Sequence, residues 1–352
     1  MSNSRSWSDH PLVQLTRVRY REFFREPEAV FWIFIFPVLL AAGLGIAFRN
    51  RAPERTIVGV VERSAEDTSL VSALRQGADL EVRVMSDSAA REALRNGDVA
   101  LLAVSTTGAA VEYRYDDTRP ESRTARLLVD DALQRAQGRR DPLTVADRLV
   151  RERGARYIDF LVPGLVGMNL MGSGIWGLGF AIVDARKKRL LKRLIATPMS
   201  RFQYLASFAL SRLTLLIIEV GLLLGFAVLA FGVPVRGSLP LLVLICLVSS
   251  LSFASLGLLI ASRAQTIEGA SGLMNLVMLP MWIFSGVFFS AARFPEAIQP
   301  MIQALPLTAV IDALRANILR GAGWQTVAPE LAIISAWLVV SFVLALKLFR
   351  WR

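Results

Sequence analysis

The chain has 352 residues, of which 54% are hydrophobic, and a formal net charge of +11. The apolar residues are gathered into runs of about 20, the length of a helix that crosses the hydrocarbon core of a bilayer, so a soluble globular fold is excluded. Because the sequence contains a single cysteine, Cys246, an intrachain disulfide and a thiolate metal cluster are excluded as well.

Six apolar runs predict an α-helical polytopic membrane protein with a small extracytoplasmic α/β domain inserted after the first helix. The first run is longer than the roughly 7–15 apolar residues of a signal peptide, which indicates a retained anchor. The predicted spans are 29–48, 158–183, 205–231, 239–261, 268–290 and 330–349.

Basic residues are distributed asymmetrically around these spans. The N-terminal arm (1–28), the 184–201 loop, Arg263 and the C-terminus hold sixteen Lys and Arg. The short loops on the opposite side hold Arg236, Arg293, Arg315 and Arg320. By the positive-inside rule both termini are cytoplasmic, which six spans satisfy, and a bacterial cytoplasmic membrane is the expected location. The excess charge lies beside the membrane, so no nucleic-acid partner is expected.

Residues 11–26 have the pattern of an amphipathic helix lying in the inner membrane interface, where it would contact lipid. Its arginines recur at every fourth position, opposite an apolar and aromatic face. A first span that begins early is the alternative interpretation. The arginines are Arg17, Arg21 and Arg25, and the apolar face is Leu12, Leu15, Tyr20, Phe23 and Phe24.

Residues 49–156 hold 19 Arg and no Lys against 18 acidic residues, so this segment is nearly neutral. Alternating apolar residues predict strands, and 3.6-residue periodicity predicts helices between and after them. A small α/β domain follows. The predicted strands are 56–61, 80–84, 98–104 and 110–115, and the predicted helices are 67–76, 87–96 and 120–138. The second helix stops at Asn96-Gly97. The third has a predicted apolar face of Leu127, Leu128, Ala132, Leu133 and Ala136.

Two further segments lie outside the predicted spans. Residues 184–200 form a basic amphipathic stretch that ends at Pro198. A solvated cationic face and a docking helix for a cytoplasmic partner are both compatible with it. Residues 291–329 contain two short, fairly apolar pieces broken by prolines, each too short to cross a bilayer, which suits re-entrant or interfacial helices over a cavity.

The sequence contains no motif that indicates a catalytic function. The sequence contains no phosphate-binding loop of the form G-x-x-x-x-G-K-[ST], so this chain is not expected to hydrolyse ATP, and no metal, cofactor or catalytic site is predicted. Gly172 to Gly177 fit G-x-G-x-x-G but lie inside a span, where glycines favour close helix packing, as in Gly221-x-x-x-Gly225. Glu219 and Arg212, seven residues apart in the third span, suit either a structural contact or a transport role.

Three segments resemble type-2 ABC exporter permeases of the subgroup with an extracytoplasmic domain between the first two spans. Asp184 through Lys192-Arg193-Leu194-Ile195-Ala196-Thr197-Pro198-Met199-Ser200-Arg201 is similar to the family pattern E-x-x-x-G-T-L-E-R-L-x-x-T-P-[LM]-S-R, with Asp at 184 and Lys188-Arg189 in place of Gly-Thr. The second match is Phe160 to Gly164, which opens the second span. The third is Ser285 to Ser290 followed by Leu305 to Arg315, the C-terminal signature.

This resemblance implies a transmembrane permease subunit, with ATP and Mg²⁺ bound by a separate ABC-type ATP-binding subunit. It implies a dimer with a second permease copy or paralogue, and export of a drug-like, antibiotic or other amphipathic substrate. Export of polysaccharide or lipid-linked glycan is an alternative within the family. A membrane receptor or scaffold that senses an extracytoplasmic ligand is the alternative from another class.

The candidate site residues fall into two sets. The coupling set contacts the ATPase in such an arrangement; it comprises Asp184, Lys187, Lys188, Leu190, Leu191, Arg193, Leu194, Thr197 and Pro198. The path set is expected to line or gate the translocation path; it comprises Asn169, Glu219, Asn275, Gly286, Phe288, Phe289 and Pro306.

Overall fold

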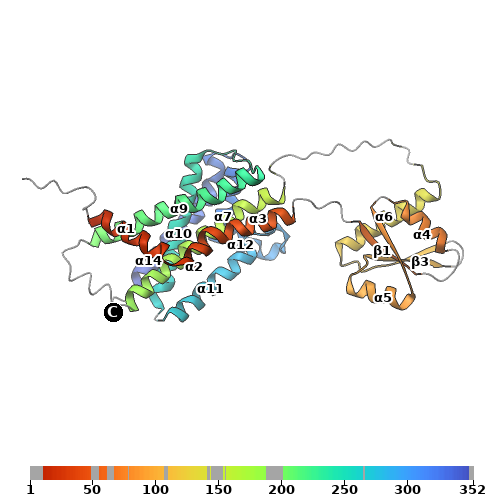
Figure 1. The fold of residues 1–352 in the computed structure, drawn as a ribbon, viewed down its shortest axis with the longest axis horizontal. Helices are drawn as coiled ribbons and strands as arrows, with labels where there is room; N and C mark the ends of the chain where they lie inside the picture. The colour runs from red at the N-terminus through yellow and green to blue at the C-terminus, as the bar shows by residue number, and fades with distance from the viewer. Residues whose placement is uncertain are drawn as a thin grey trace, which may run out of the picture. The chain divides into compact units, whose positions relative to one another are not determined.

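The computed structural model describes residues 11–48, 55–61, 67–77, 79–106, 110–140, 143, 154, 156–187, 201–264 and 266–348. The chain divides into two compact units, Asn50–Val150 and the remainder, Met1–Arg49 with Arg151–Arg352 (Figure 1). We call them the α/β unit and the helical unit.

The α/β unit is a four-stranded sheet with helices on both faces. Strand order is β2-β1-β3-β4, with β1 parallel to β2 and β3, and β4 antiparallel to β3. Alternate residues of β1 enter two separate cores: Val58 and Val60 pack under α4 and α6, and Val61 packs under α5. The elements are β1 (Thr56–Val61), α4 (Asp67–Arg75), β2 (Leu80–Met85), α5 (Asp87–Asn96), β3 (Leu101–Thr106), β4 (Ala110–Arg114) and α6 (Pro120–Ala136).

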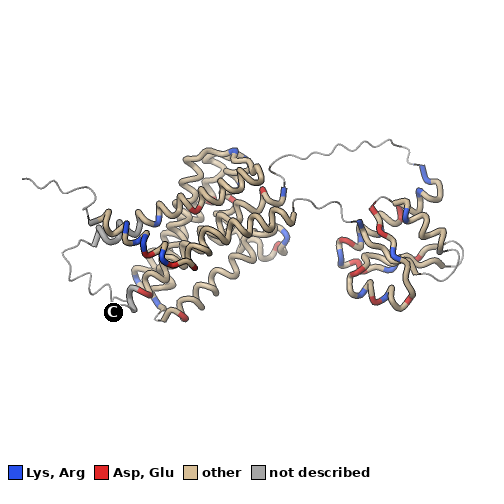
Figure 2. Tube along the Cα trace, in the orientation of Figure 1, with Lys and Arg blue, Asp and Glu red and all other residues tan. Residues whose placement is uncertain are grey.

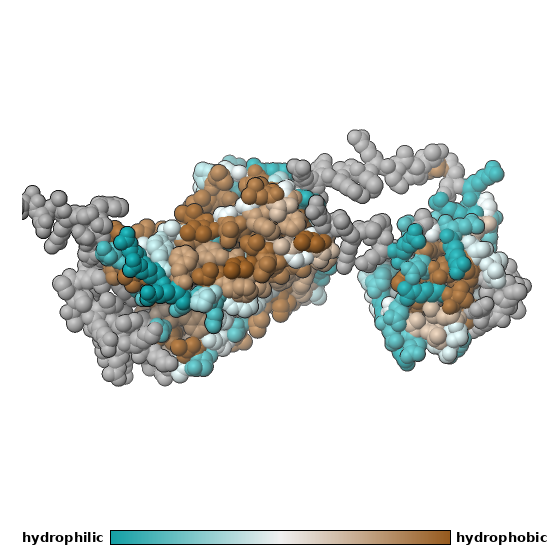
Figure 3. All heavy atoms as spheres, in the orientation of Figure 1, coloured by the Kyte–Doolittle hydropathy of each residue, from teal (hydrophilic) through white to brown (hydrophobic). Residues whose placement is uncertain are grey.

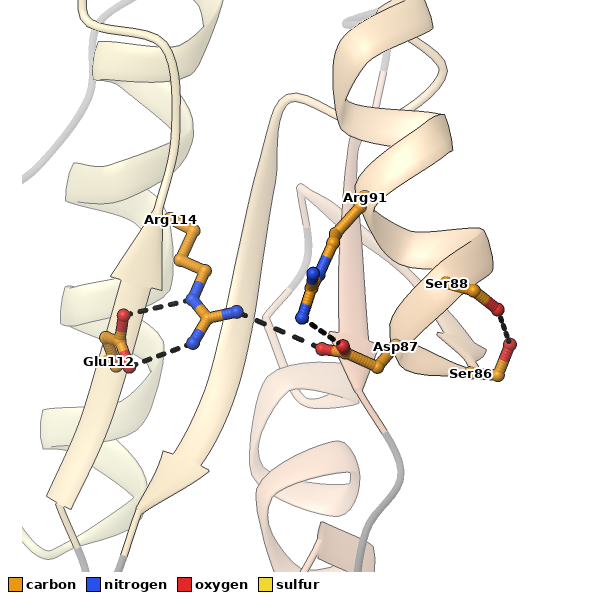
Figure 4. A network of polar contacts seen from close by, with 6 residues as sticks. All are labelled: Ser86, Asp87, Ser88, Arg91, Glu112 and Arg114. Atoms are coloured by element: carbon orange, nitrogen blue, oxygen red, sulfur yellow. Dashed lines mark hydrogen bonds and ion pairs between the residues drawn. The ribbon is translucent and has the colours of Figure 1, made fainter.

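A polar network on the surface of this unit joins α5 to β4 (Figure 4). Asp87 Oδ2 accepts a hydrogen bond of 2.5 Å from Arg91 Nη2, and Asp87 Oδ1 lies 3.9 Å from Arg114 Nη1. Arg114 Nε also donates to Glu112 Oε1 at 2.9 Å. Exposed ion pairs of this kind contribute about 0–1 kcal/mol each, so the network fastens an edge strand without dominating stability.

The predicted elements of the α/β unit are confirmed with two corrections. The first strand has the predicted bounds, and α5 ends where Gly97 adopts φ +84°, a conformation that glycine takes without strain. The third strand begins three residues later than predicted, at Leu101. The predicted apolar face of α6 is confirmed at Leu128, Ala132 and Leu133, which pack in the core with Ala125 and Val129, but Leu127 and Ala136 are exposed.

Within the described residues, the helical unit contains six helices long and apolar enough to cross a membrane, which confirms the predicted fold class. Charged residues gather toward the ends of these helices, and apolar side chains cover the flank of the bundle (Figures 2 and 3). The first span is built from α2 (Pro27–Val30), the π-helical turn η2 (Phe31–Ile35) and α3 (Phe36–Ala47); the others are α7 (Tyr157–Lys187), α9 (Arg201–Phe231), α10 (Leu239–Arg263), α11 (Ile267–Phe284) and α14 (Trp324–Leu348).

The core of this unit forms where α10 packs against α7 and α14. We call the end of the bundle where α3 ends and α7 begins the insertion end, and the opposite end the terminal end. At the insertion end two short helices, α12 (Gln299–Ala304) and α13 (Pro306–Ile318), meet at a bend of 83°. Pro306 at the first position of α13 suits this bend, because proline lacks the amide that a continuous helix would use. The predicted pair of short helices is thereby confirmed.

Several span boundaries differ from the prediction, and three of them have a structural consequence. The fifth span ends at Phe284 rather than 290, because the chain turns at Gly286, where φ is +78°. The sixth begins at Trp324, six residues before the predicted start. The second continues without a break to Lys187, so Asp184 and Lys187 belong to the last turn of α7 and do not begin a separate helix.

The glycine predictions have mixed outcomes. A Cβ at Gly174 would lie 2.6 Å from the Cβ of Phe253, so this glycine does allow close approach of α7 and α10. At Gly221 and Gly225 a Cβ would meet no heavy atom within 4 Å. The predicted helix contact at these two positions of α9 is therefore wrong for the described part of the chain.

The N-terminal amphipathic segment forms helix α1 (Pro11–Phe24), which packs along α9 (Figure 1). Thr16 is buried, and the ring of Phe23 lies 5.8 Å from that of Phe34 in the first span. Arg17, Arg21 and Arg25 are exposed, as the sequence pattern predicts.

Candidate functional site

Four polar residues meet between the spans, and we call them the intramembrane polar cluster. Asn169 and Ser173 lie one turn apart on α7, and Arg212 and Glu219 lie two turns apart on α9. Glu219 is 2% exposed, and the side chain of Arg212 is 25% exposed. An uncompensated charge at the centre of a span costs about 2.5–3.5 kcal/mol on insertion scales, which explains why these groups face one another and not lipid.

The hydroxyl of Ser173 is the centre of this cluster. It accepts a short hydrogen bond from Arg212 Nη2 and lies 3.0 Å from Glu219 Oε1 and 2.7 Å from the backbone oxygen of Asn169. The direct distance between Arg212 Nη2 and Glu219 Oε2 is 4.0 Å, too long for a hydrogen bond. Ser173 therefore connects the two charges, and it also links α7 to α9.

Compensation within the cluster is incomplete. Among the described residues, Glu219 Oε2 and Arg212 Nε are buried and have no hydrogen-bond partner. A buried charge normally uses its hydrogen-bonding capacity fully, because each missing bond costs about 1–3 kcal/mol. The carboxylate thus keeps one oxygen available to a further donor.

Asn169 connects the cluster to the first span. Its Nδ2 donates to the backbone oxygen of Ile33 at 3.0 Å, within the π-helical turn η2. A π-turn interrupts the regular helical hydrogen-bond ladder, and Asn169 donates to the backbone at this interruption. Three spans consequently meet at one set of polar contacts.

A second set of contacts, which we call the Arg315 junction, lies at the insertion end. Arg315 Nη2 donates to the backbone oxygens of Gly286 at 2.6 Å and Phe160 at 3.3 Å, and its guanidinium carbon lies 3.7 Å from the centre of the Phe160 ring. Asp312, one turn earlier on α13, is 4.0 Å from Arg315 Nη1. One side chain thereby fastens α13 to the start of α7 and to the turn after α11.

Close backbone packing reinforces this junction. A Cβ at Gly164 would lie 2.6 Å from the backbone oxygen of Val287, so only glycine fits there. The hydroxyl of Tyr157 donates to the backbone oxygen of Phe288 at 3.1 Å. Two of the three segments that carried the family resemblance, 160–164 and the C-terminal signature, are thus in direct contact.

The path set divides between these two places. Asn169 and Glu219 belong to the intramembrane polar cluster, whereas Gly286 and Phe288 belong to the Arg315 junction and its reinforcing contacts. Pro306 is buried at the start of α13, and the ring of Phe289 packs 5.8 Å from that of Phe294. Asn275 lies half-buried on α11, a helix that contributes no residue to the cluster. That any of these residues lines a translocation path stays a prediction.

Most of the coupling set lies outside the described residues, namely Lys188, Leu190, Leu191, Arg193, Leu194, Thr197 and Pro198. Asp184 and Lys187 lie at the end of α7. The predicted docking role of this segment stays a prediction.

A clamp at the insertion end is not among the sites predicted from the sequence. Arg156 Nη1 donates to the backbone oxygen of Phe231 at 2.9 Å, and Arg156 Nη2 donates to Asp159 Oδ1 at 2.8 Å. Asp159 is fully buried and also accepts from the backbone amide of Gly154 at 2.9 Å. The i, i+3 spacing of Arg156 and Asp159 at the start of a span is the signal that could have revealed it. The clamp fixes the last carbonyls of α9 to the start of α7.

Comparison with known proteins agrees with this architecture. The chain is 27% identical over 173 residues to the inner membrane transport permease YhhJ of Escherichia coli (strain K12), covering 49% of this chain and 46% of that protein. It is 24% identical over 181 residues to the probable multidrug ABC transporter permease YbhR of the same organism, covering 50% and 49%. It is 26% identical over 174 residues to the linearmycin resistance permease protein LnrN of Bacillus subtilis (strain 168), covering 49% and 45%.

The alignments span about half the length of each of these relatives. A family model matches a longer part of the chain. The model described as "ABC-2 family transporter protein" covers residues 28–347. This range contains all six candidate spans, apart from one residue at the start of the first span and one at the end of the sixth. The chain is therefore a multi-pass membrane protein of the ABC-2 transporter family.

Proposed function

We propose that the chain is the permease subunit of an ATP-driven exporter whose substrate is a drug-like, antibiotic or other amphipathic compound. The match of residues 28–347 to the ABC-2 family carries the proposal. Relatives named as a probable multidrug permease and a linearmycin resistance permease favour this substrate class over glycans.

In the proposed arrangement two permease copies, or this chain and a paralogue, form a dimer. Each binds a separate ABC-type ATP-binding subunit through residues 184–200. Nucleotide-driven closure of those subunits would switch the helices between two packings, because ATP binds one state better than the other. The Arg315 junction supports this idea, since it holds α7, α11 and α13 as one piece at the insertion end, which we assign to the extracytoplasmic side.

Purification of the full chain from its native membrane in mild detergent tests the partner directly. We expect an ABC-type ATP-binding protein to copurify, and cells lacking the chain to accumulate more of a fluorescent amphipathic drug. An altered surface glycan with unchanged drug accumulation would contradict the proposed substrate class. If cells lacking the chain show unchanged drug accumulation and an unchanged surface glycan, and no ATPase copurifies, the exporter function itself would be contradicted.

A pair of triple variants tests the coupling segment. Replacing Leu190, Leu191 and Leu194 by Ser removes its apolar face, and burial of three leucines contributes very roughly 1.5–3 kcal/mol each. We expect loss of ATPase copurification and of transport while membrane insertion is retained. Replacing Lys187, Lys188 and Arg189 by Gln is the matched control with a smaller effect, because exposed ion pairs contribute about 0–1 kcal/mol. Serine variants that retain both ATPase and transport would disprove the coupling role.

A further inference from the structure

Glu219 is the charged residue farthest from either end of a span among the six described spans. It lies twelve residues before Phe231, where α9 ends, and still farther from Arg201, where α9 begins, so its backbone is roughly 18 Å or more from either end of the helix. No rearrangement of its short side chain brings the carboxylate to the membrane surface. Glu219 consequently depends on protein or ligand groups for its compensation.

Arg212 is placed quite differently. It lies seven residues nearer the terminal end than Glu219, roughly 10 Å along the axis of α9, and a quarter of its side chain is exposed. Arginine stems of this length carry the guanidinium to the aqueous interface while their methylenes stay in the apolar region. The guanidinium of Arg212 can therefore move out of the cluster toward the membrane interface, whereas the carboxylate of Glu219 cannot.

The departure of Arg212 would leave the carboxylate alone in a medium of low dielectric constant, where a single charge is costly. A replacement cation removes this cost. The position of Oε2 favours such an exchange, because this buried oxygen has no hydrogen-bond partner among the described residues and Arg212 Nη2 is 4.0 Å away. An ammonium group carries three donors, enough for Oε2, Oε1 and the hydroxyl of Ser173.

The location of the cluster also suits entry of a ligand. Helix α7 packs much more extensively against α10 than against α9, so the contact between α7 and α9 separates with the smaller loss of packing. The cluster lies along that contact, through Ser173 on one helix and Arg212 and Glu219 on the other.

We propose that Glu219 is the recognition group for the protonated amine of an amphipathic substrate, which takes the place of Arg212 at the carboxylate and is bridged by Ser173. The proposal rests on the proposed export function, and it narrows the substrate class to amphipathic cations. It assigns opposite roles to the two members of one ion pair, since Glu219 binds the ligand and Arg212 competes with it.

The test is binding of dansylcadaverine, a fluorescent amphipathic primary amine, to the purified full chain in lipid nanodiscs. Its N-acetyl derivative has the same fluorophore and chain but no charge. We expect Glu219→Gln to weaken dansylcadaverine binding at least about tenfold and to change N-acetyl binding less than about twofold, because a charged hydrogen bond is lost only for the amine. Arg212→Gln is expected to tighten amine binding severalfold, because the competing cation is removed.

Three controls make the outcome decisive. Empty nanodiscs correct for partition into lipid, and Glu268→Gln makes the same chemical change at an exposed residue at the start of α11. Thermal unfolding checks that each variant is folded. If Glu219→Gln does not fold, Arg212→Gln and Ser173→Ala still decide, with expected tightening and severalfold weakening of amine binding.

A purely structural ion pair gives a different pattern. Its two variants would shift amine affinity in the same direction, or alter both compounds equally, and either result overturns the proposal. Binding of neither compound by the unmodified chain also overturns it. None of these results bears on ATPase copurification, so the exporter function stands or falls separately.

Discussion

Arg315 and Phe160 are 155 residues apart in the sequence, yet the guanidinium carbon of Arg315 lies 3.7 Å from the centre of the Phe160 ring and Nη2 reaches the Phe160 backbone oxygen. The same nitrogen donates to Gly286 at 2.6 Å. Three segments that the sequence separates are thus fixed by one planar, multidentate cation, a role for which lysine is a poor substitute.

Substitution of Arg315 should therefore destabilise the helical unit. Arg315→Ala removes charge-assisted hydrogen bonds worth about 1.5–3 kcal/mol each, and Arg315→Lys should recover only part of the loss. Arg293→Ala is the matched control, because Arg293 is exposed near the same end of the bundle. Thermal unfolding in detergent measures the effect, and equal midpoints for Arg315→Ala and Arg293→Ala would refute it.

Two glycines of α7 should respond oppositely to alanine. At Gly164 a Cβ would lie 2.6 Å from the Val287 backbone oxygen, and we expect Gly164→Ala to cost about 1–3 kcal/mol through overpacking. At Gly177 a Cβ meets nothing within 4 Å, so Gly177→Ala should be neutral or stabilise by up to about 1 kcal/mol through helix propensity. Unfolding midpoints measured side by side test the contrast, which a destabilised Gly177→Ala would contradict.

The α/β unit should lose stability at high pH through Tyr113. Burial first, and then the nearby Asp130 carboxylate, raise the pKa of Tyr113 from 10.0 to about 12. The folded state holds this proton more tightly than the unfolded chain, so the contribution is complete below pH 10 and is lost as pH rises through 12.

A fragment of residues 52–154, which we expect to fold without disulfide or metal, allows the measurement. With Tyr115→Phe, tyrosinate absorbance reports Tyr113 alone. Asp130→Asn should lower the pKa of Tyr113 only partly, because burial is the larger cause. An unperturbed titration in the folded fragment, or a fragment without secondary structure by circular dichroism, would contradict this prediction.

Topology reporters test the assignment of the two ends of the bundle. Fusions after Gly108 and Gly237 should report the extracytoplasmic side, and fusions after Lys188 and Arg352 the cytoplasm, because Lys and Arg are concentrated beside the latter positions. A cytoplasmic signal from the Gly108 fusion would reverse the orientation.

The sequence predicts the existence of each span but not all of its limits. Span length follows from apolar runs, which the bilayer dictates. The end of α11 does not follow, because Val287, Phe288 and Phe289 continue the apolar run while the positive φ of Gly286 and its bond to Arg315 end the helix. These are tertiary constraints, which local hydropathy does not encode.

The candidate site was predictable where charge is rare. Glu219 and Arg212 are conspicuous in an apolar run, and their seven-residue spacing places them on one face of α9. The sequence does not distinguish Ser173, because its segment fits a small-residue packing motif. Hydroxyls are common in spans, and only the fold shows that this one lies between two charges.

The π-helical turn of the first span has a consequence for insertions and deletions. A π-turn holds one residue more than the α-helical turn it replaces, and each residue of an α-helix advances the chain by about 100°. Because the π-turn takes up this extra residue, deleting one residue from Phe31–Ile35 would give a continuous α-helix and leave the helix beyond it in the same phase relative to Pro27–Val30. Ala41, which is fully buried, and Gly45, beside Phe231, would then keep their present neighbours. The first span thus accommodates a single supernumerary residue within this turn, and Asn169 on a different helix donates a hydrogen bond to the backbone there.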